Sequence, residues 1–413
     1  MTGPYDVLII GGGLVGASLA CALESLIHQN GLKVVMIETH SLDEPRARPP
    51  SFDARSSALS YGTRLIYDRL GLWQGLKNKA TAIQHVHISD RGHFGVTRLD
   101  HHSEGVPALG YVIDNFLLGD ALLERLNSYR EQGTIDTFSP AEVITVKSGQ
   151  NCQKALVRSP EGQEQWINTS LVALADGGRS GLMEQLNLEK TIHDYGQYAL
   201  IANVAVDRPH KGIAYERFAG KGPMALLPKM ITEEAEQNNN HHHFGLVWTL
   251  SDNEVDEMTG LDDRAFLAQL QDRFGFRAGR FLRVGQRDCY PLQMSLAREQ
   301  VRPGLVVLGN AAHAIHPVAG QGYNLAIRDV MALTENIKGS LIQGQPVGEL
   351  SRLMQYLQTQ EGDQKRTVAF CDGLVKLFSR SESSVVLARN LGLLGLELGG
   401  SLKSQFARAA MGI

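Results

Sequence analysis

The first forty residues combine two apolar runs with a glycine cluster. Residues 5–10 are an apolar run of strand length, and Gly11 to Gly16 follow at once. Apolar positions then recur with helical spacing to about Ile27, and a second apolar run, 33–37, ends at Glu38. This order predicts a strand, a tight turn, a helix and a second, parallel strand, which together form a βαβ unit.

The next part of the chain leaves this pattern and later returns to it. Residues 46–51 are rich in Pro and Arg, which favours an extended surface loop, and 58–70 show helical periodicity. Residues 82–89 alternate between apolar and polar, as in a half-buried strand. A helix is then predicted at 114–129, with strands at 142–147 and 171–175.

Strand-like runs dominate the second half until about residue 250. They lie at 199–206, 213–218 and 244–250, separated by turns, which predicts a mostly antiparallel sheet. A parallel-type strand at 305–308 then precedes a second glycine turn and a helix near 322–337, and the residues to 413 are expected to be helical. The fold class is therefore α/β, with a Rossmann-type lobe, an antiparallel-sheet lobe and C-terminal helices.

These elements suggest a discontinuous division of the chain. We expect residues 1–80, 108–181 and 285–340 to form the first domain, 81–107 and 182–284 the second, and 341–413 a C-terminal helical region.

Composition excludes several classes of protein. The 413 residues carry 44 acidic and 40 basic side chains, for a net charge of −4, and show no polybasic arm, so nucleic acid is not expected as a partner. The four cysteines lack metal-ligand spacing, which suits a reducing compartment without structural zinc. The best apolar stretch, 385–398, is interrupted by Arg389 and Glu397, so no membrane span is predicted.

The glycine cluster fits a dinucleotide-binding fingerprint. Gly11, Gly13 and Gly16 would permit a tight turn and close approach of a pyrophosphate to the helix N-terminus, and Glu38 would accept a hydrogen bond from an adenosine ribose. A chance glycine-rich turn is the alternative, made improbable by the flanking strand and helix. The fingerprint alone does not separate NAD from FAD.

A second glycine turn carries a more specific pattern. Residues 305–329 place Asn310 just after a strand and Gly320, Gln321, Gly322 and Asn324 at the start of a helix. This segment resembles the motif that holds the FAD ribityl chain and flavin ring in group A flavoprotein monooxygenases, which have the p-hydroxybenzoate hydroxylase fold. Members of that family usually have Asp at the position of Asn310, where an amide can still form hydrogen bonds.

Two further segments resemble the same family. Residues 174–181, with Asp176, resemble its Asp-Gly motif, which contacts FAD. Residues 53–60 resemble a stretch whose arginine, here Arg55, commonly approaches the cofactor. The alternative for Arg55 is a solvated loop arginine beside Arg46 and Arg48.

Within this family the chain resembles the ubiquinone-biosynthesis hydroxylases, above all those acting on 2-polyprenyl-6-methoxyphenol. The resemblance implies FAD as cofactor, NAD(P)H as a transient donor, and transfer of oxygen from O2 to a phenol ring through a hydroperoxide at flavin C4a, in an apolar pocket. Ala326 and Phe116 depart from the usual Gly and Arg, which leaves the flavin or donor contacts there uncertain. No catalytic base is assigned, because His316 fits a role in shaping the turn as well as one in catalysis.

Several alternatives remain open from the sequence. His313 with His316, and His241 to His243, lack a complete set of metal ligands, so no metal is expected, and the triplet is predicted to be a solvated loop. Residues 391–398 could contact lipid, a partner protein or a sister subunit, or pack internally. We expect a hydrophobic polyprenyl phenol as substrate, a cytoplasmic location with peripheral contact at the inner face of the membrane, and a homo-oligomer or biosynthetic complex. Hydroxylation of another ring position or another aromatic substrate, and a non-catalytic flavin-bearing scaffold, are the competing functions.

Overall fold

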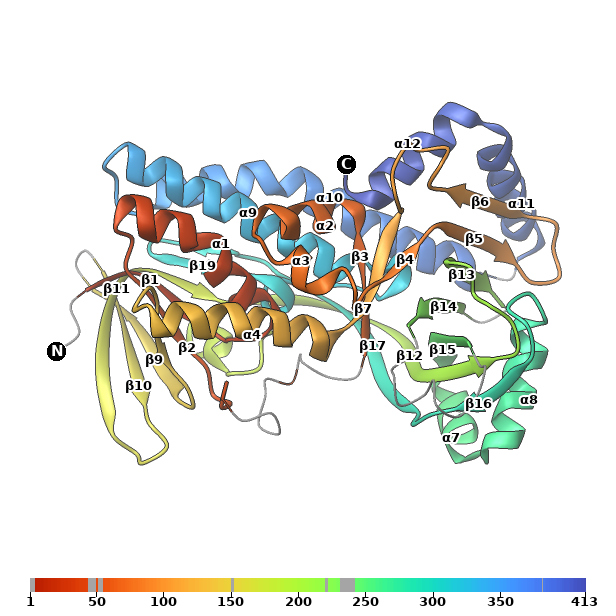
Figure 1. Ribbon diagram of the computed structural model, residues 1–413, viewed down its shortest axis with the longest axis horizontal. Helices are drawn as coiled ribbons and strands as arrows, with labels where there is room; N and C mark the ends of the chain where they lie inside the picture. The colour runs from red at the N-terminus through yellow and green to blue at the C-terminus, as the bar shows by residue number, and fades with distance from the viewer. Residues whose placement is uncertain are drawn as a thin grey trace.

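The computed structural model describes residues 4–43, 50, 55–149, 152–219, 222–230, 242–380 and 382–413. Most of the loop predicted at 46–51, Asp53 and Ala54 of the arginine motif, and His241 lie outside this range. Figure 1 shows two lobes side by side, with long helices running along one side of the molecule.

The first lobe is built on a mostly parallel sheet with strand order β18-β19-β11-β1-β2-β8. β1 lies inside the sheet and is apolar because both of its faces are buried. The antiparallel strands β9 and β10 extend from β11. The strands are β1 (Tyr5–Ile10), β2 (Val34–Ile37), β8 (Asp136–Phe138), β9 (Glu142–Ser148), β10 (Gln153–Arg158), β11 (Glu164–Leu174), β18 (Val301–Arg302) and β19 (Leu305–Val307).

The second lobe is built on a nine-stranded sheet that collects distant segments of the chain. Its order is β20-β17-β12-β15-β14-β13-β5-β6, with β16 paired to β12; all of these pairs are antiparallel except β13 with β5. The strands are β5 (His85–Asp90), β6 (Val96–Asp100), β12 (Lys190–Val206), β13 (Ile213–Phe218), β14 (Pro223–Lys229), β15 (His242–Ser251), β16 (Phe281–Val284), β17 (Asp288–Ala297) and β20 (His313–Ala314).

A small third sheet joins the two lobes. It contains β3 (Ser56–Ser60), β4 (Thr81–Ile83) and β7 (Gly110–Asp114). An ion pair crosses from this sheet to the second lobe, because Lys229 Nζ lies 2.7 Å from Asp114 Oδ1.

Helices cover the sheets and form the C-terminal part of the chain. α1 packs against α4 and α9 in the first lobe, α7 and α8 pack on the second sheet, and α11 contacts β6. The helices are α1 (Leu14–Asn30), α2 (Tyr61–Arg69), α3 (Trp73–Leu76), α4 (Asn115–Glu131), α5 (Leu182–Gln185), α7 (Asp252–Gly260), α8 (Asp263–Phe274), α9 (Gln321–Ile342), α10 (Leu350–Ser379), α11 (Ser383–Leu398) and α12 (Gly400–Met411).

Two predicted elements differ from the structure. Helical periodicity was expected from residue 58, but Ala58 to Ser60 belong to β3 because they pair with β7, and the Ser60 hydroxyl accepts the Thr63 N–H to cap α2. The histidine triplet was expected in a loop, but His242 and His243 begin β15, where they pair with Val206 and Ala205 of β12.

The domain division stays a prediction, and the topology suggests one adjustment to it. The boundary at residue 285 precedes β17, which pairs with β12 in the second sheet. We therefore propose that the return to the first domain begins after Ala297.

Membrane-spanning capacity is limited among the described residues. No single helix there is long and apolar enough to cross a bilayer, whereas α11 and α12, which meet at a 99° bend, reach the required length and composition only as a pair.

Candidate active site

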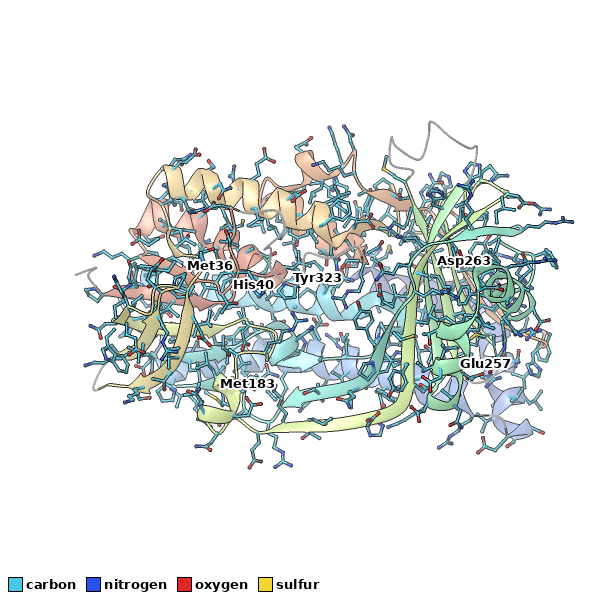
Figure 2. All side chains as sticks on the ribbon, turned by 90° about the horizontal axis from the view of Figure 1, so that it is seen from below. Met36, His40, Met183, Glu257, Asp263 and Tyr323 are labelled. Carbon is cyan, nitrogen blue, oxygen red and sulfur yellow. The ribbon has the colours of Figure 1, made fainter. Side chains whose placement is uncertain are left out.

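A large cavity lies between the two main sheets. Its volume is about 1220 Å³, above the range of about 300–1,000 Å³ that is usual for a single small-molecule site. Figure 2 places Tyr323 between the first lobe, marked by Met36 and His40, and the second, marked by Asp263. The cavity is lined by ten of the eleven residues predicted from the sequence as cofactor contacts, which are Gly11, Gly13, Glu38, Arg55, Asp176, Asn310, Gly320, Gln321, Gly322 and Asn324.

The first glycine turn brings bare backbone to the cavity. Gly11 has φ +99°, and a Cβ there would lie 2.7 Å from the carbonyl oxygen of Ala175. Gly16 does not line the cavity; a Cβ there would overlap the carbonyl oxygen of Gly11. Gly13 is the residue just before α1, and no side chain caps this end of the helix. The first backbone N–H groups of α1 therefore lie at the cavity without a side-chain partner from a cap. Such a turn is suited to an anion.

Glu38 closes this turn from the end of β2. Its Oε2 accepts the backbone N–H of Gly12 at 2.6 Å, and its Oε1 accepts the N–H of His40 at 2.8 Å. The carboxylate is buried but lines the cavity. Glu38 therefore holds the turn in shape and also presents oxygen atoms next to it.

Asp176 orders the loop that follows β11. Its Oδ1 accepts the N–H of Gly178 at 2.8 Å, and its Oδ2 accepts the N–H of Ser180 at 2.9 Å and also the Ser180 hydroxyl. The carboxylate is thus largely engaged within its own loop, and it lies beside Gly11 at the cavity wall.

The second glycine turn contains two residues with positive φ, Ala319 and Gly320, just before α9. The side-chain amide of Gln321 donates to the carbonyl oxygens of Ala319 and Ala410, so it ties the turn to α12. Asn310 is exposed at the cavity wall after β19. The turn therefore offers backbone groups to a ligand, and Asn310 lies at the same cavity wall, while Gln321 stabilises the turn itself.

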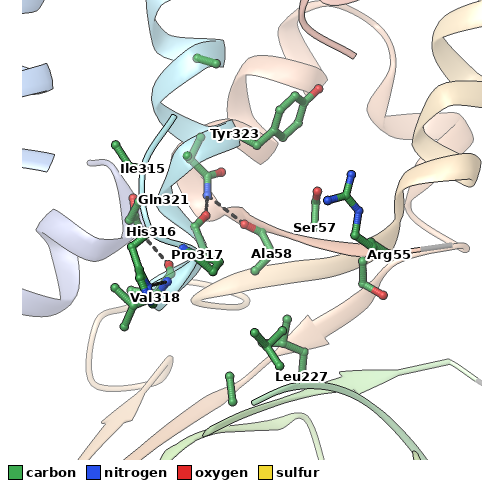
Figure 3. Close-up of a pocket in the computed structure, with 18 of the residues that line it drawn as sticks. Arg55, Ser57, Ala58, Leu227, Ile315, His316, Pro317, Val318, Gln321 and Tyr323 are labelled. Atoms are coloured by element: carbon green, nitrogen blue, oxygen red, sulfur yellow. Dashed lines mark hydrogen bonds between the residues drawn. The ribbon is translucent and has the colours of Figure 1, made fainter. Parts of the chain in front are cut away.

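Asn324 connects this turn to the small joining sheet. Its Oδ1 accepts the N–H of Ser60, and its Nδ2 donates to the carbonyl oxygens of Ala58 and Gly320, all at 2.8 Å. These contacts engage both the oxygen and the nitrogen of the amide, so Asn324 positions the turn against β3. In Figure 3, Gln321, His316 and Val318 lie on one side of the cavity and Arg55 and Ser57 on the other.

Arg55 lies at the cavity wall, just before β3. Its guanidinium carbon is 5.1 Å from the ring centroid of Tyr290 on β17. Its neighbour Ser57 donates to Asn115 Oδ1 at 2.6 Å, which joins this segment to α4. Tyr290 and Asn115 were not identified from the sequence, because only long-range strand pairing brings them here.

The two histidines near the second turn have different partners. His316 Nδ1 accepts the N–H of Val318 at 3.1 Å, and burial lowers the pKa of His316 to about 4, so the ring is neutral near pH 7. His313 Nε2 instead pairs with Asp329 Oδ2 at 2.5 Å on α9. Within the described ranges, no group of three or more His, Cys, Asp or Glu side chains is arranged to hold a metal ion.

Sequence reasoning missed Glu216 on β13. It lines the cavity on the second sheet, and burial raises its pKa to about 7. The signal was present in the alternation of β13, where Glu216 shares a face with the buried Ala214 and Phe218.

Comparison with known proteins places the chain in a family. The FAD binding domain family matches residues 4–358. Ubiquinone hydroxylase UbiL of Rhodospirillum rubrum is 33% identical over 413 residues, covering 98% of this chain and 89% of the relative. The 3-demethoxyubiquinol 3-hydroxylase of Escherichia coli is 26% identical and covers 99% of both chains.

Solved structures show the same fold. The p-nitrophenol 4-monooxygenase PnpA of Pseudomonas putida superposes with a TM-score of 0.76 at 16% identity, covering 100% of this chain and 98% of that one. PqsL of Pseudomonas aeruginosa, a probable FAD-dependent monooxygenase, gives 0.73 at 19% identity, covering 95% and 100%. The predicted p-hydroxybenzoate-hydroxylase-like fold is confirmed.

The predicted cofactor is confirmed as well, and the geometry suits it. A turn that excludes a Cβ at Gly11, an uncapped helix start and the Glu38 carboxylate lie at one end of a cavity large enough for a dinucleotide. The chain therefore belongs to the FAD binding domain family and is an FAD-dependent monooxygenase of the branch that contains the ubiquinone-biosynthesis hydroxylases.

Proposed function

We propose that the protein hydroxylates the aromatic ring of a polyprenyl methoxyphenol in ubiquinone biosynthesis, with NAD(P)H as electron donor and O2 as oxygen source. The observation that carries this proposal is the continuity of one cavity from the glycine turns of the first lobe to the apolar face of the second sheet. Relatives that are named as ubiquinone hydroxylases over almost their full length support the substrate class.

The residues at the polar end of the cavity would hold FAD. In this proposal the N–H groups at the start of α1, opened by Gly11, Gly13 and Gly16, bind the pyrophosphate, and Glu38 accepts from the adenosine ribose. Asn310 and Arg55 would contact the ribityl and flavin portions. Asp176 and Asn324 would act by holding their loops in position.

The second glycine turn would face the flavin ring. Backbone N–H groups of Gln321 and Gly322 at the N-terminus of α9 favour negative charge beside them. FAD, when bound, supplies the electron transfer from NAD(P)H and the reaction with O2. The chain supplies the charge environment, the orientation of the substrate and the exclusion of water.

The second sheet would orient the substrate ring and keep water out. Val86, Ile88, Leu227 and Val247 present apolar side chains to the cavity from three strands, β5, β14 and β15. An apolar wall limits wasteful release of the activated oxygen into water and accommodates a hydrophobic substrate.

A polyprenyl substrate would reach this cavity from a lipid surface, and α11 offers a face for that contact. Its exposed side includes the leucines Leu387, Leu391, Leu394 and Leu398, whereas its inner residues Leu393 and Leu396 line the cavity. We therefore propose peripheral membrane contact through this leucine face. Flotation with liposomes should be strong for the wild type and reduced several-fold by Leu391→Ser with Leu398→Ser; equal flotation would contradict the contact.

The ring position and the catalytic nature of the protein are tested by one assay. Purified protein is mixed with NADH or NADPH, O2 and 2-prenyl-6-methoxyphenol, and the product is identified by mass and by NMR. A product heavier by one oxygen on the aromatic ring supports the proposal, and the NMR spectrum gives the ring position. FAD reduction without any product indicates a flavin-bearing scaffold.

A further inference from the structure

We propose that Glu216 is the catalytic base of this site and accepts the proton of the substrate's phenolic hydroxyl during ring hydroxylation. This inference rests on the proposed function, because it requires a phenol in the cavity. It assigns a role to the one charged side chain that stands in a row of apolar residues on the cavity wall.

The strand register defines that row. Glu216 pairs with Ala225 of β14 on one side and with Ile88 of β5 on the other. Ala225 pairs in turn with Val247 of β15, and Val247 pairs with Ile201 of β12. All five residues line the cavity. A straight line of side chains across the sheet therefore forms the wall, and Glu216 is its only carboxyl.

The neighbours of Glu216 on β13 pack on α8, although Tyr215 also borders the cavity. Tyr215 packs on Phe274 of α8, and the guanidinium of Arg217 lies over the same Phe274 ring. Because side chains alternate along a strand, Glu216 is directed to the cavity, with Ala214 and Phe218.

A charged group on the neighbouring strand β5 is already engaged elsewhere. Asp90 of β5 accepts from Arg389 Nε at 2.7 Å and from Asn390 Nδ2 at 2.8 Å, both on α11. The Cys371 thiol of α10 is a titratable neighbour, because burial and then the charge of Glu216 raise the pKa of this thiol. β14 and β15 contribute only the apolar Ala225 and Val247 to this row.

Cys371 of α10 links Glu216 to the second glycine turn. Burial and then the charge of Glu216 raise the pKa of the Cys371 thiol, and Cys371 Sγ lies 3.7 Å from the carbonyl oxygen of Val318. Val318 is the residue whose N–H is bound by the neutral His316. Glu216 and this turn line the same cavity.

A carboxyl that has no hydrogen-bond or ion-pair partner in the described part of the chain, set in an apolar wall, costs folding free energy and is more easily explained by chemistry than by packing. Burial raises its pKa to about 7, close to the value at which a general base works best near neutral pH. The structure shows no cation that would lock it as a permanent carboxylate among the described residues.

The proton transfer balances within the overall reaction. The phenolic O–H bond breaks and an O–H bond forms on Glu216, while the electron pair left on the phenolic oxygen moves into the ring as a ring carbon takes up an oxygen atom derived from O2. The displaced ring C–H proton leaves to water. The proton on Glu216 returns to the phenolic oxygen as the ring becomes aromatic again.

The test compares Glu216→Gln with the wild type and with Glu335→Gln, an exposed carboxyl on α9 that serves as matched control. Each protein is assayed for FAD content, for flavin reduction by NADH without substrate, and for hydroxylation of 2-prenyl-6-methoxyphenol and of its methyl ether between pH 5.5 and 9. The methyl ether has no phenolic proton to lose.

We expect Glu216→Gln to keep FAD and flavin reduction and to lose about 10²–10⁴-fold in hydroxylation of the phenol. The rise in rate centred near pH 7 should disappear, and the preference for phenol over methyl ether should collapse. Glu335→Gln should match the wild type. Hydroxylation by Glu216→Gln within twofold of the wild type, with the same pH profile, overturns the assignment.

The wild type shows whether the proposed function itself fails. A wild type that reduces its flavin but hydroxylates no phenol overturns both the proposed function and the role of Glu216, whereas an active Glu216→Gln overturns only the role of Glu216. If Glu216→Gln loses FAD, the same assays on Glu216→Asp test the assignment, because this variant keeps a carboxyl but moves it. A lower rate that keeps the rise with pH supports the assignment, and an unchanged rate contradicts it.

Discussion

The side-chain oxygen of Asn324 accepts the backbone N–H of Ser60 at 2.8 Å, across 264 positions of sequence. The same amide donates to Ala58 and Gly320, so one side chain fixes the second glycine turn against β3. In this way the two segments proposed to face the flavin are held together before any cofactor binds.

Asn324→Ala should destabilise the protein and weaken FAD retention together. The substitution leaves the buried Ser60 N–H and the Ala58 carbonyl without this partner, which costs about 1–3 kcal/mol for each unpaired group. Denaturant unfolding and the flavin absorbance after gel filtration measure the two effects. Thr359→Ala on the exposed face of α10 is the control. Normal FAD retention in a destabilised Asn324→Ala protein would show that the turn does not need this support.

Gly13→Ala should weaken FAD binding without unfolding the chain. Gly13 has φ −68°, which alanine adopts without strain, so the new methyl acts on the ligand approaching the turn. Gly75→Ala, in open space on α3, is the matched control. Titration of apoprotein with FAD should give a Kd raised at least tenfold for Gly13→Ala only. Equal Kd values would place the pyrophosphate elsewhere.

The neutral His316 should make the protein sensitive to acid. Burial lowers its pKa to about 4, whereas the unfolded chain takes up the proton near pH 6.5. The unfolded state therefore binds more protons between these values, and the free energy of unfolding should fall as pH falls from about 6.5 to about 4. His316→Asn can still accept the Val318 N–H. It should show a shallower loss in denaturant unfolding across this range, and an identical slope would refute the prediction.

Arg389→Met should release α11 from the second lobe. Among the described residues it leaves the buried Asp90 carboxylate with Asn390 as its remaining side-chain partner, and breaking a buried ion pair in this way costs about 3–5 kcal/mol. Hydrogen exchange should speed up in α11 and in β5. Arg158→Met, which removes an exposed pair with Glu164, should leave exchange unchanged. Unaltered protection of α11 in Arg389→Met would show that Leu393 and its neighbours hold the helix alone.

Local sequence patterns were sufficient where the structure is local. The run from Tyr5 to Glu38 folds as predicted because strand, turn, helix and strand follow one another along the chain. The start of β3 was mistaken for helix because only its pairing with β7 makes it a strand. In the site, the glycines were visible from spacing, whereas Tyr290, Asn115 and Glu216 reach the cavity wall from strands and a helix that are distant in sequence.

Side-chain roles were harder to predict than their positions. Gln321 and Asn324 belong to the second motif, yet the side-chain amides of both form hydrogen bonds with backbone groups of the protein itself. The sequence shows that a polar residue stands at a turn, but the folded chain decides whether it contacts a ligand or holds the turn.

The central claim is that reduced flavin and O2 deliver oxygen to a phenol ring in the cavity between the two sheets. The most direct measurement is a single turnover of the reduced holoenzyme with 2-prenyl-6-methoxyphenol and ¹⁸O₂, followed by mass analysis of the product. The account predicts a ring-hydroxylated product that carries one ¹⁸O atom. Reoxidation of the flavin with hydrogen peroxide formed and the phenol recovered unchanged would contradict it.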